Sequence, residues 1–279
     1  MHDMSVKWPN GARCAVMLTF DFDAETLWLA RDPVNARRPG ILSQGTYGAK
    51  VGVPKVVELL DEAGIKATFF VPGWTAERHT ARVELILKHG HEIGHHSYDH
   101  VYVDPDFPEK EEEDLVKGLD ALKRTIGVVP RGYRSPAWEM SDNMLALLSR
   151  YGFAYDSSMM DQIDPYRFPS RDGRPGLIEL PVQWSLDDAP FVLFSVARPR
   201  TIVSNEQILE VWKDEFREIY RWGGLFDLTM HPQLIGRPSR IAMLRAFIAW
   251  MRTFPGVWFA TAGEIADAWA AQEPAGVTA

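Results

Sequence analysis

Residues 14–25 read Cys14-Ala-Val-Met-Leu-Thr-Phe-Asp-Phe-Asp-Ala-Glu25, an apolar run that ends in alternating acidic residues. The apolar part has the length and composition of a buried β-strand, which we place at about residues 14–21. Because side chains alternate along a strand, Asp21 and Asp23 should point to one side and Phe22 to the other. Two carboxylates after a buried strand need a cation or hydrogen-bond donors nearby, so this stretch predicts both the first strand and a site.

Further apolar runs of strand length alternate with helix-like segments, as in βα units around a mostly parallel sheet. Seven or eight strands with intervening helices predict an α/β fold, a distorted or incomplete TIM-like (β/α) barrel, and we expect a single domain over residues 1–279. Residues 24–50, rich in Gly, Pro and Arg, are expected to form a long loop that could act as a lid. We place further strands near residues 67–71, 92–95, 154–156, 178–186, 225–230 and 257–260, and helices near 53–63, 76–89, 110–125, 141–151, 205–222, 239–253 and 262–271.

Composition and charge exclude several classes of partner. The chain is 46% hydrophobic and 24% charged, with a formal net charge of -8. Nucleic-acid binding needs clustered Lys and Arg, so neither a nucleic acid nor a polyanionic substrate is expected. Cys14 is the only cysteine, so no intrachain disulfide can form.

The amino terminus lacks the apolar stretch of a secretory signal and no run is long enough to span a bilayer, so we expect a cytoplasmic protein without a membrane partner. The sequence leaves open whether the protein forms a homo-oligomer.

Histidines gather in one part of the chain. Five of the eight lie between His89 and His100, and His96-Ser-Tyr-Asp-His100 places two imidazoles four residues apart. Helical turning of this segment would bring both rings to one face, although such pairs also occur on ordinary surface helices. Together with Asp23 they form a set of two histidines and one carboxylate, which leaves coordination positions open, as in a catalytic zinc site. A metal held there would lower the pKa of its water, and the free carboxylate could take the proton.

Four motifs occur along the chain in a characteristic order: Leu18-Thr-Phe-Asp-Phe-Asp-Ala-Glu25, His96-Ser-Tyr-Asp-His100, Arg134-Ser-Pro-Ala-Trp138 and Leu228-Thr-Met-His231. On these motifs the sequence resembles the polysaccharide deacetylase family, also called carbohydrate esterase family 4 or the nodulation-protein-B homology domain. The resemblance covers most of the chain. It implies one catalytic domain that hydrolyses carbon–nitrogen bonds with a divalent metal ion. Zinc is the default ion, whereas cobalt, nickel or manganese could also occupy this ligand set.

The resemblance also implies a role for each motif residue. Asp23, His96 and His100 would hold the metal. Asp21 would be the general base, with Arg134 paired to it. His231 would be the general acid that protonates the departing amine.

Substrate contacts are assigned to three further residues. The backbone N–H of Ala137 would help to hold the developing oxyanion. Trp138 is expected to line the substrate groove and Tyr47 to contact the ligand, although both aromatics could instead pack on the barrel. Arg134 and His231 also have structural alternatives, a surface ion pair and a buried core histidine.

The first motif departs from the common family pattern, in which two aspartates are adjacent. Here Phe22 separates them, and Ala24 and Glu25 follow. This form resembles a branch that includes peptidoglycan deacetylase-like proteins, cyclic imide hydrolases and allantoinase-like enzymes. The leading expectation is N-deacetylation of an acetylated amino sugar or peptidoglycan-type glycan. The alternatives are hydrolysis of a small cyclic imide or ureide and, in another class, a non-catalytic binding module on the same fold.

Overall fold

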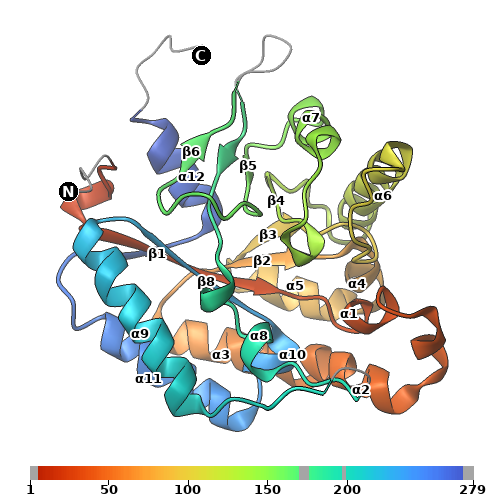
Figure 1. The fold of residues 1–279 in the computed structure, drawn as a ribbon, viewed down its shortest axis with the longest axis horizontal. Coiled ribbons are helices and arrows are strands. Elements are labelled where there is room, and N and C mark those ends of the chain that lie inside the picture. Colours follow the sequence, from red (N-terminus) through yellow and green to blue (C-terminus); the bar gives the residue numbers. More distant parts are fainter. Residues whose placement is uncertain (1–5, 170–175, 197–198, 273–279) are drawn as a thin grey trace.

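The computed structural model of the protein describes residues 6–169, 176–196 and 199–272. These residues form a curled sheet with helices packed around its outside (Figure 1). The strand order is β6-β7-β5-β4-β3-β2-β1-β8, and β9 pairs with β1 beside this path. The expected fold class, an α/β distorted or incomplete TIM-like barrel, is confirmed. The strands are β1 (Cys14–Asp21), β2 (Thr68–Val71), β3 (Glu92–His95), β4 (Gly132–Tyr133), β5 (Tyr155–Asp156), β6 (Tyr166–Arg167), β7 (Ile178–Glu179), β8 (Leu225–Met230) and β9 (Val257–Ala260).

Strand β1 lies between β2 and β8 in the strand order, and every residue in it is buried. It pairs in parallel with β8 along most of its length, with β9 at its beginning and with β2 at its end. Parallel strands covered on both faces are largely apolar, which explains the run from Cys14 to Phe20, where Thr19 is the one polar residue. Within the described residues only β6 and β7 pair antiparallel. The carboxyl ends of the other strands therefore share one edge of the sheet, and β1 delivers Asp21 to that edge.

The helices cover the outside of the sheet through their apolar faces. On α9 and α11, Trp212, Phe216 and Phe247 are fully buried, and Phe216 packs on Phe226 of β8 with ring centroids 5.3 Å apart. The α-helices are α1 (Thr26–Leu29), α2 (Pro39–Tyr47), α3 (Val53–Ala63), α4 (Gly73–Arg78), α5 (Thr80–Lys88), α6 (Pro108–Ile126), α7 (Asp142–Arg150), α8 (Ala189–Val192), α9 (Asn205–Trp222), α10 (Pro232–Ile235), α11 (Pro238–Met251) and α12 (Ala262–Ala270). Shorter helical turns are η1 (Pro9–Gly11), η2 (Pro33–Arg37), η3 (Gly48–Gly52), η4 (Pro136–Trp138) and η5 (Trp184–Leu186).

Three local expectations differ from the structure. The stretch at 24–50 is largely helical rather than a long loop, because Pro33 and Pro39 occupy first-turn positions that begin η2 and α2. The helix expected at 76–89 divides at His79, whose φ of -124° and ψ of 36° are not helical. The strand expected at 178–186 is limited to β7, because its last residues form the η5 turn.

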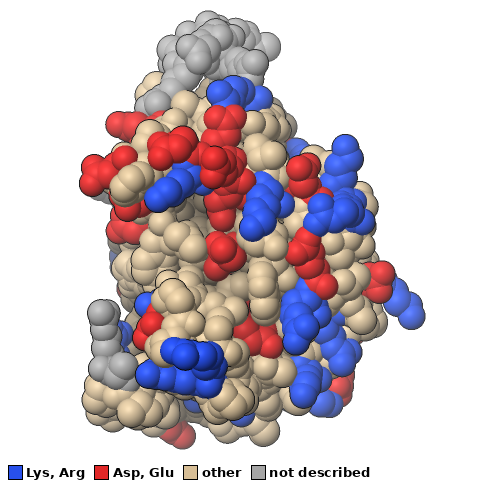
Figure 2. Space-filling view, turned by 90° about the vertical axis from the view of Figure 1, so that its right-hand side faces the viewer, with Lys and Arg blue, Asp and Glu red and all other residues tan. Residues whose placement is uncertain are grey.

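Charge is mixed on the face shown in Figure 2. Acidic side chains gather toward the upper part of that view, and several basic groups lie below them. Neither acidic nor basic side chains cover this face continuously. None of the helices in the described part of the chain combines the length and apolar character that spanning a bilayer requires.

Candidate active site

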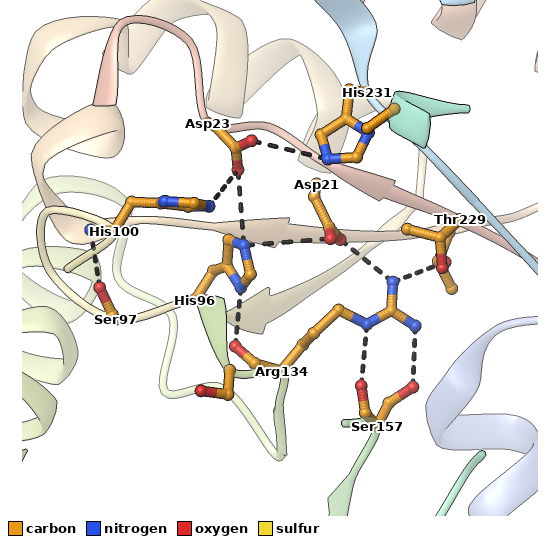
Figure 3. Close-up of polar contacts among 12 residues, drawn as sticks. Asp21, Asp23, His96, Ser97, His100, Arg134, Ser157, Thr229 and His231 are labelled. Atoms are coloured by element: carbon orange, nitrogen blue, oxygen red, sulfur yellow. Dashed lines mark hydrogen bonds and ion pairs between the residues drawn. The ribbon is translucent and has the colours of Figure 1, made fainter. Parts of the chain in front are cut away.

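Four strands deliver polar side chains to the carboxyl edge of the sheet. Asp21 and Asp23 come from the end of β1, His96 from the end of β3, Arg134 from the end of β4 and His231 from the end of β8. In Figure 3 these side chains converge on one space, although they come from segments far apart in the sequence. Active sites of α/β barrels are assembled at this edge. The expected meeting place of the motif residues is therefore the one observed.

Asp23, His96 and His100 form a compact, buried group. The Nε2 atoms of the two imidazoles lie 3.4 Å and 3.6 Å from Oδ1 of Asp23. One potential ligand atom from each residue falls within 4.8 Å of the others, and all three side chains are buried. Oδ1 of Asp23 has no hydrogen-bond partner among the described residues. A buried carboxylate oxygen without a donor, facing two imidazole nitrogens, fits a divalent cation.

The protonation states of the imidazoles suit metal binding. Nδ1 of His96 donates to the carbonyl of Arg134 at 2.7 Å, which leaves Nε2 as the free nitrogen toward Asp23. Burial lowers the pKa of His100 to about 4, so this ring is neutral near pH 7. Burial alone would raise the pKa of Asp23, but the surrounding histidines, His100 first, lower it overall. Burial lowers the pKa of His96, but the carboxylates of Asp21 and Asp23 outweigh it and raise that pKa, so a metal ion would displace a proton from this ring.

The segment from His96 to His100 is a strained turn rather than a helix. Ser97 and His100 have φ values of 62° and 66°, in the left-handed region. The turn is held by its own hydrogen bonds, because Oγ of Ser97 accepts from the backbone N–H of His100 at 2.8 Å. The carboxylate of Asp114 accepts from the N–H of Tyr98 at 3.1 Å. The expectation that helical turning brings the rings together was wrong, although the rings do meet.

Arg134 is completely buried beside Asp21. Its Nη1 donates to Oδ1 of Asp21 at 3.1 Å and to Thr19 Oγ1 at 2.7 Å. Its Nη2 donates to Oδ2 of Asp227 at 2.8 Å, and its remaining contacts go to Ser157. The alternative of a surface ion pair is excluded by this burial. Asp227 and Ser157 were not anticipated, although an acidic residue inside the apolar run of β8 is a signal that could have indicated Asp227.

His231 faces one carboxylate oxygen of Asp23, whereas the imidazoles of His96 and His100 face the other. Its Nε2 is 3.7 Å from Oδ2 of Asp23, and its Nδ1 is 2.7 Å from Oδ1 of Asp188. Oδ1 of Asp187 is 3.6 Å from the same Nδ1. Burial lowers the pKa of His231, but the two carboxyl groups of Asp187 and Asp188 outweigh it and raise that pKa well above its usual range. Both aspartates follow Trp184 in the sequence and lie outside the four motifs.

The other three predicted site residues occupy different environments. Ala137 has a φ of 53° and Trp138 a φ of 59°, within the η4 turn that follows Arg134. Trp138 is buried and packs on the exposed Trp184, with ring centroids 4.3 Å apart. Tyr47 instead donates from its hydroxyl to the carbonyl of Gly236 at 3.0 Å. Its contacts match the alternative in which this tyrosine anchors α2 to the body of the barrel.

An incomplete α/β barrel with carboxylates, imidazoles and a buried guanidinium gathered at the carboxyl ends of its strands is the architecture of a hydrolytic enzyme. The family model for polysaccharide deacetylases matches residues 11–155. A peptidoglycan deacetylase of Helicobacter pylori is 30% identical over 91% of this chain and 95% of its own length. The chain belongs to the polysaccharide deacetylase family, whose deacetylases hydrolyse non-peptide carbon–nitrogen bonds.

Solved structures agree with this assignment. A Mycobacterium smegmatis protein, provisionally described as a polysaccharide deacetylase, superimposes with a TM-score of 0.91 at 41% identity, covering 98% of this chain and 96% of that one. An allantoinase superimposes with a TM-score of 0.83 at 24% identity, covering 96% of this chain and 94% of that one. At 24% identity, the similarity to the allantoinase supports the fold alone.

Proposed function

We propose that this protein is a metal-dependent N-deacetylase that hydrolyses the acetamido group of an acetylated amino sugar in a peptidoglycan-type glycan, with residues 1–279 as one catalytic domain. The observation that carries the proposal is the buried, unpartnered Oδ1 of Asp23 facing Nε2 of both His96 and His100. The naming of the Helicobacter pylori relative as a peptidoglycan deacetylase supports the glycan substrate.

Asp23, His96 and His100 would hold the metal, with zinc as the default ion for this ligand set. A divalent cation at this site supplies a Lewis acid that acidifies water and polarises the amide carbonyl. A related acetyl xylan esterase of Clostridium thermocellum was crystallised with a cobalt ion, which supports the choice of a transition metal.

Asp21 takes the proton from the attacking water in this proposal. Its Oδ2 is 3.9 Å from Nε2 of His96, so the carboxylate borders the metal-facing side of that ring. Its other oxygen accepts from Arg134, which fixes the orientation of the carboxylate. A positioned carboxylate near the attacking water is the requirement for a general base.

His231 donates a proton to the departing amine. Its Nδ1 bond to Asp188 leaves Nε2 directed toward Asp23 and the reaction space. The raised pKa keeps the ring protonated near neutral pH, as a general acid needs. The backbone N–H of Ala137, which follows Arg134 in the η4 turn, is the donor that we assign to the developing oxyanion.

A second candidate function is hydrolysis of a small cyclic imide or ureide, which uses the same attack on a carbonyl beside nitrogen. The allantoinase likeness supports it through the fold.

The test compares two substrate panels and two histidine variants. Purified protein is stripped with a chelator, reloaded with Zn²⁺ or Co²⁺, and assayed for acetate release from N-acetylated oligosaccharides and for ring opening of succinimide-like compounds. We expect metal-dependent acetate release that His96→Ala abolishes. His89→Ala is the matched control, because His89 pairs with Asp61 on the surface. A reloaded protein that releases no acetate would contradict the proposal, and ring opening would favour the second candidate.

A further inference from the structure

Two buried carboxyl groups lie outside the reaction described above. Asp156 and Glu179 occupy paired positions on the adjacent parallel strands β5 and β7. Both residues have 0% exposure. Neither forms an ion pair with a Lys or Arg side chain in the described part of the chain. Isolated carboxylates are costly at such depth, so their contacts need a physical account.

Three of their oxygen contacts face the segment that follows β5. Oε1 of Glu179 accepts from the backbone N–H groups of Ser158 and Met159, both at 2.9 Å. Oδ1 of Asp156 accepts from the hydroxyl of Ser158 at 2.9 Å. These bonds fix the conformation of the chain at residues 157–159.

The two remaining carboxyl oxygens have no hydrogen-bond donor among the described residues. They are Oδ2 of Asp156 and Oε2 of Glu179, and both are buried. The two side chains are nevertheless within hydrogen-bonding contact. Two ionised carboxylates in such contact repel, whereas one proton between them provides a donor and an acceptor. Burial raises the pKa of both groups, and the neighbouring carboxylate of Asp156 raises that of Glu179 further, which favours Glu179 as the protonated partner.

The segment held by this pair supports the candidate active site from behind. The carbonyl and hydroxyl of Ser157 accept from the guanidinium of Arg134 at 3.0 Å and 2.8 Å. The hydroxyl of Ser158 also accepts from the backbone N–H of Ser135 at 2.9 Å. Arg134 in turn orients Asp21 with its side chain and His96 with its carbonyl.

We propose that Asp156 and Glu179 share one proton as a carboxylic acid–carboxylate pair, and that this pair positions Arg134 and the η4 turn for the reaction. Both are positioning residues, because they act through Ser157 and Ser158. The positioning of Arg134 for the reaction rests on the proposed function, whereas the shared proton does not.

Infrared spectroscopy tests the shared proton directly. At pH 7 the wild-type protein should show a carbonyl stretch from this protonated carboxylic acid as a component of its own in the difference spectrum against Glu179→Gln, which should lose that band. Asp187, whose pKa burial raises to about 7, contributes equally to both proteins and cancels in the difference. Glu84→Gln, which changes an exposed acid on α5, is the matched control and should leave the band unchanged. Absence of the band from the wild type, or its persistence in Glu179→Gln, would overturn the shared proton.

The positioning role is tested with a conservative and a disruptive variant. In Glu179→Gln the amide oxygen can accept the two backbone N–H groups, while the amide N–H donates to Asp156. Glu179→Leu can do neither. We expect kcat to fall about 100-fold in Glu179→Leu with a much smaller change in KM, and to change less than about threefold in Glu179→Gln, because displacement of positioning groups by about 1 Å has effects of this size.

Two further measurements test the positioning role of Asp156 and Glu179. Affinity for Co²⁺, which needs no substrate, should weaken about tenfold in Glu179→Leu and stay unchanged in Glu179→Gln, because Arg134 orients His96. Ser158→Ala keeps the acid pair but removes the contact to Ser135, so it should lower kcat while retaining the infrared band. Equal effects of the Gln and Leu variants would overturn the positioning role. A wild type that releases no acetate but shows the band and the affinity difference would contradict only the proposed function.

Discussion

Replacement of Arg134 by methionine should strongly destabilise the fold, because it leaves two buried carboxyl groups without their shared cation. Arg134 donates two charge-assisted hydrogen bonds, one to Asp21 and one to Asp227. Such bonds contribute about 1.5–3 kcal/mol each, and removal of one partner from a buried ion pair costs about 3–5 kcal/mol. Because domains of this kind are stable by about 5–15 kcal/mol, Arg134→Met should remove about a fifth or more of the unfolding free energy.

The assay is urea unfolding of the metal-free protein at pH 7, compared with a matched arginine on the surface. Arg131 pairs with Asp267 at 2.6 Å with both side chains more than half exposed, so Arg131→Met should cost less than about 1 kcal/mol. The double variant Arg134→Met/Asp227→Asn should be more stable than Arg134→Met by about 1–2 kcal/mol, because one uncompensated carboxylate is neutralised. A cost below 1 kcal/mol for Arg134→Met, or strictly additive losses in the double variant, would refute the reasoning.

Three other changes probe the site and the core. Asp23→Asn should weaken Zn²⁺ binding by more than the roughly 10–100-fold that outer partners of metal ligands contribute, as measured by chelator competition; retention of wild-type affinity would exclude Asp23 as a ligand. Asp188→Asn removes a carboxylate that raises the pKa of His231, so kcat should fall about 100-fold and the alkaline limb of the pH profile should move to lower pH; an unmoved limb would contradict the general-acid role. Burial and then the nearby Lys66 lower the pKa of His91 to about 4, so the unfolded chain binds a proton below about pH 6.5 that the folded chain does not. Unfolding free energy should therefore fall by about 1 kcal/mol more between pH 7 and pH 5 in the wild type than in His91→Gln, and equal slopes would count against this contribution.

The long elements of the fold follow from local sequence patterns, whereas the short ones do not. The run at β1 and the periodic helices α3, α9 and α11 carry enough apolar residues to identify them. Strands β4 and β6 contain two residues each and were not anticipated, whereas the equally short β5 falls within the strand expected at 154–156. The β7 strand was expected to be longer than it is. The apolar residues after Glu179 are buried by tertiary packing without joining the sheet, and an apolar run alone does not distinguish the two cases.

Site residues that belong to a short sequence motif were predicted. Residues whose role depends on a contact with a distant part of the chain were missed. Asp21, Asp23, His96 and His231 were all named from local motifs, and the structure brings them together. Their supporting partners come from positions with no local pattern, and Asp227 is the clearest example. Only the register of neighbouring strands places such residues, and that register is a property of the folded sheet.

The turn between His96 and His100 is held by hydrogen bonds to Ser97 and Asp114 that involve no metal ion. Its left-handed residues therefore lose their conformational freedom when the chain folds, and not when an ion arrives. Ion exchange should consequently be a local event that leaves the backbone in place. One stripped preparation can be reloaded in turn with zinc, cobalt, nickel and manganese, so that rates with different ions are compared on the same folded molecules.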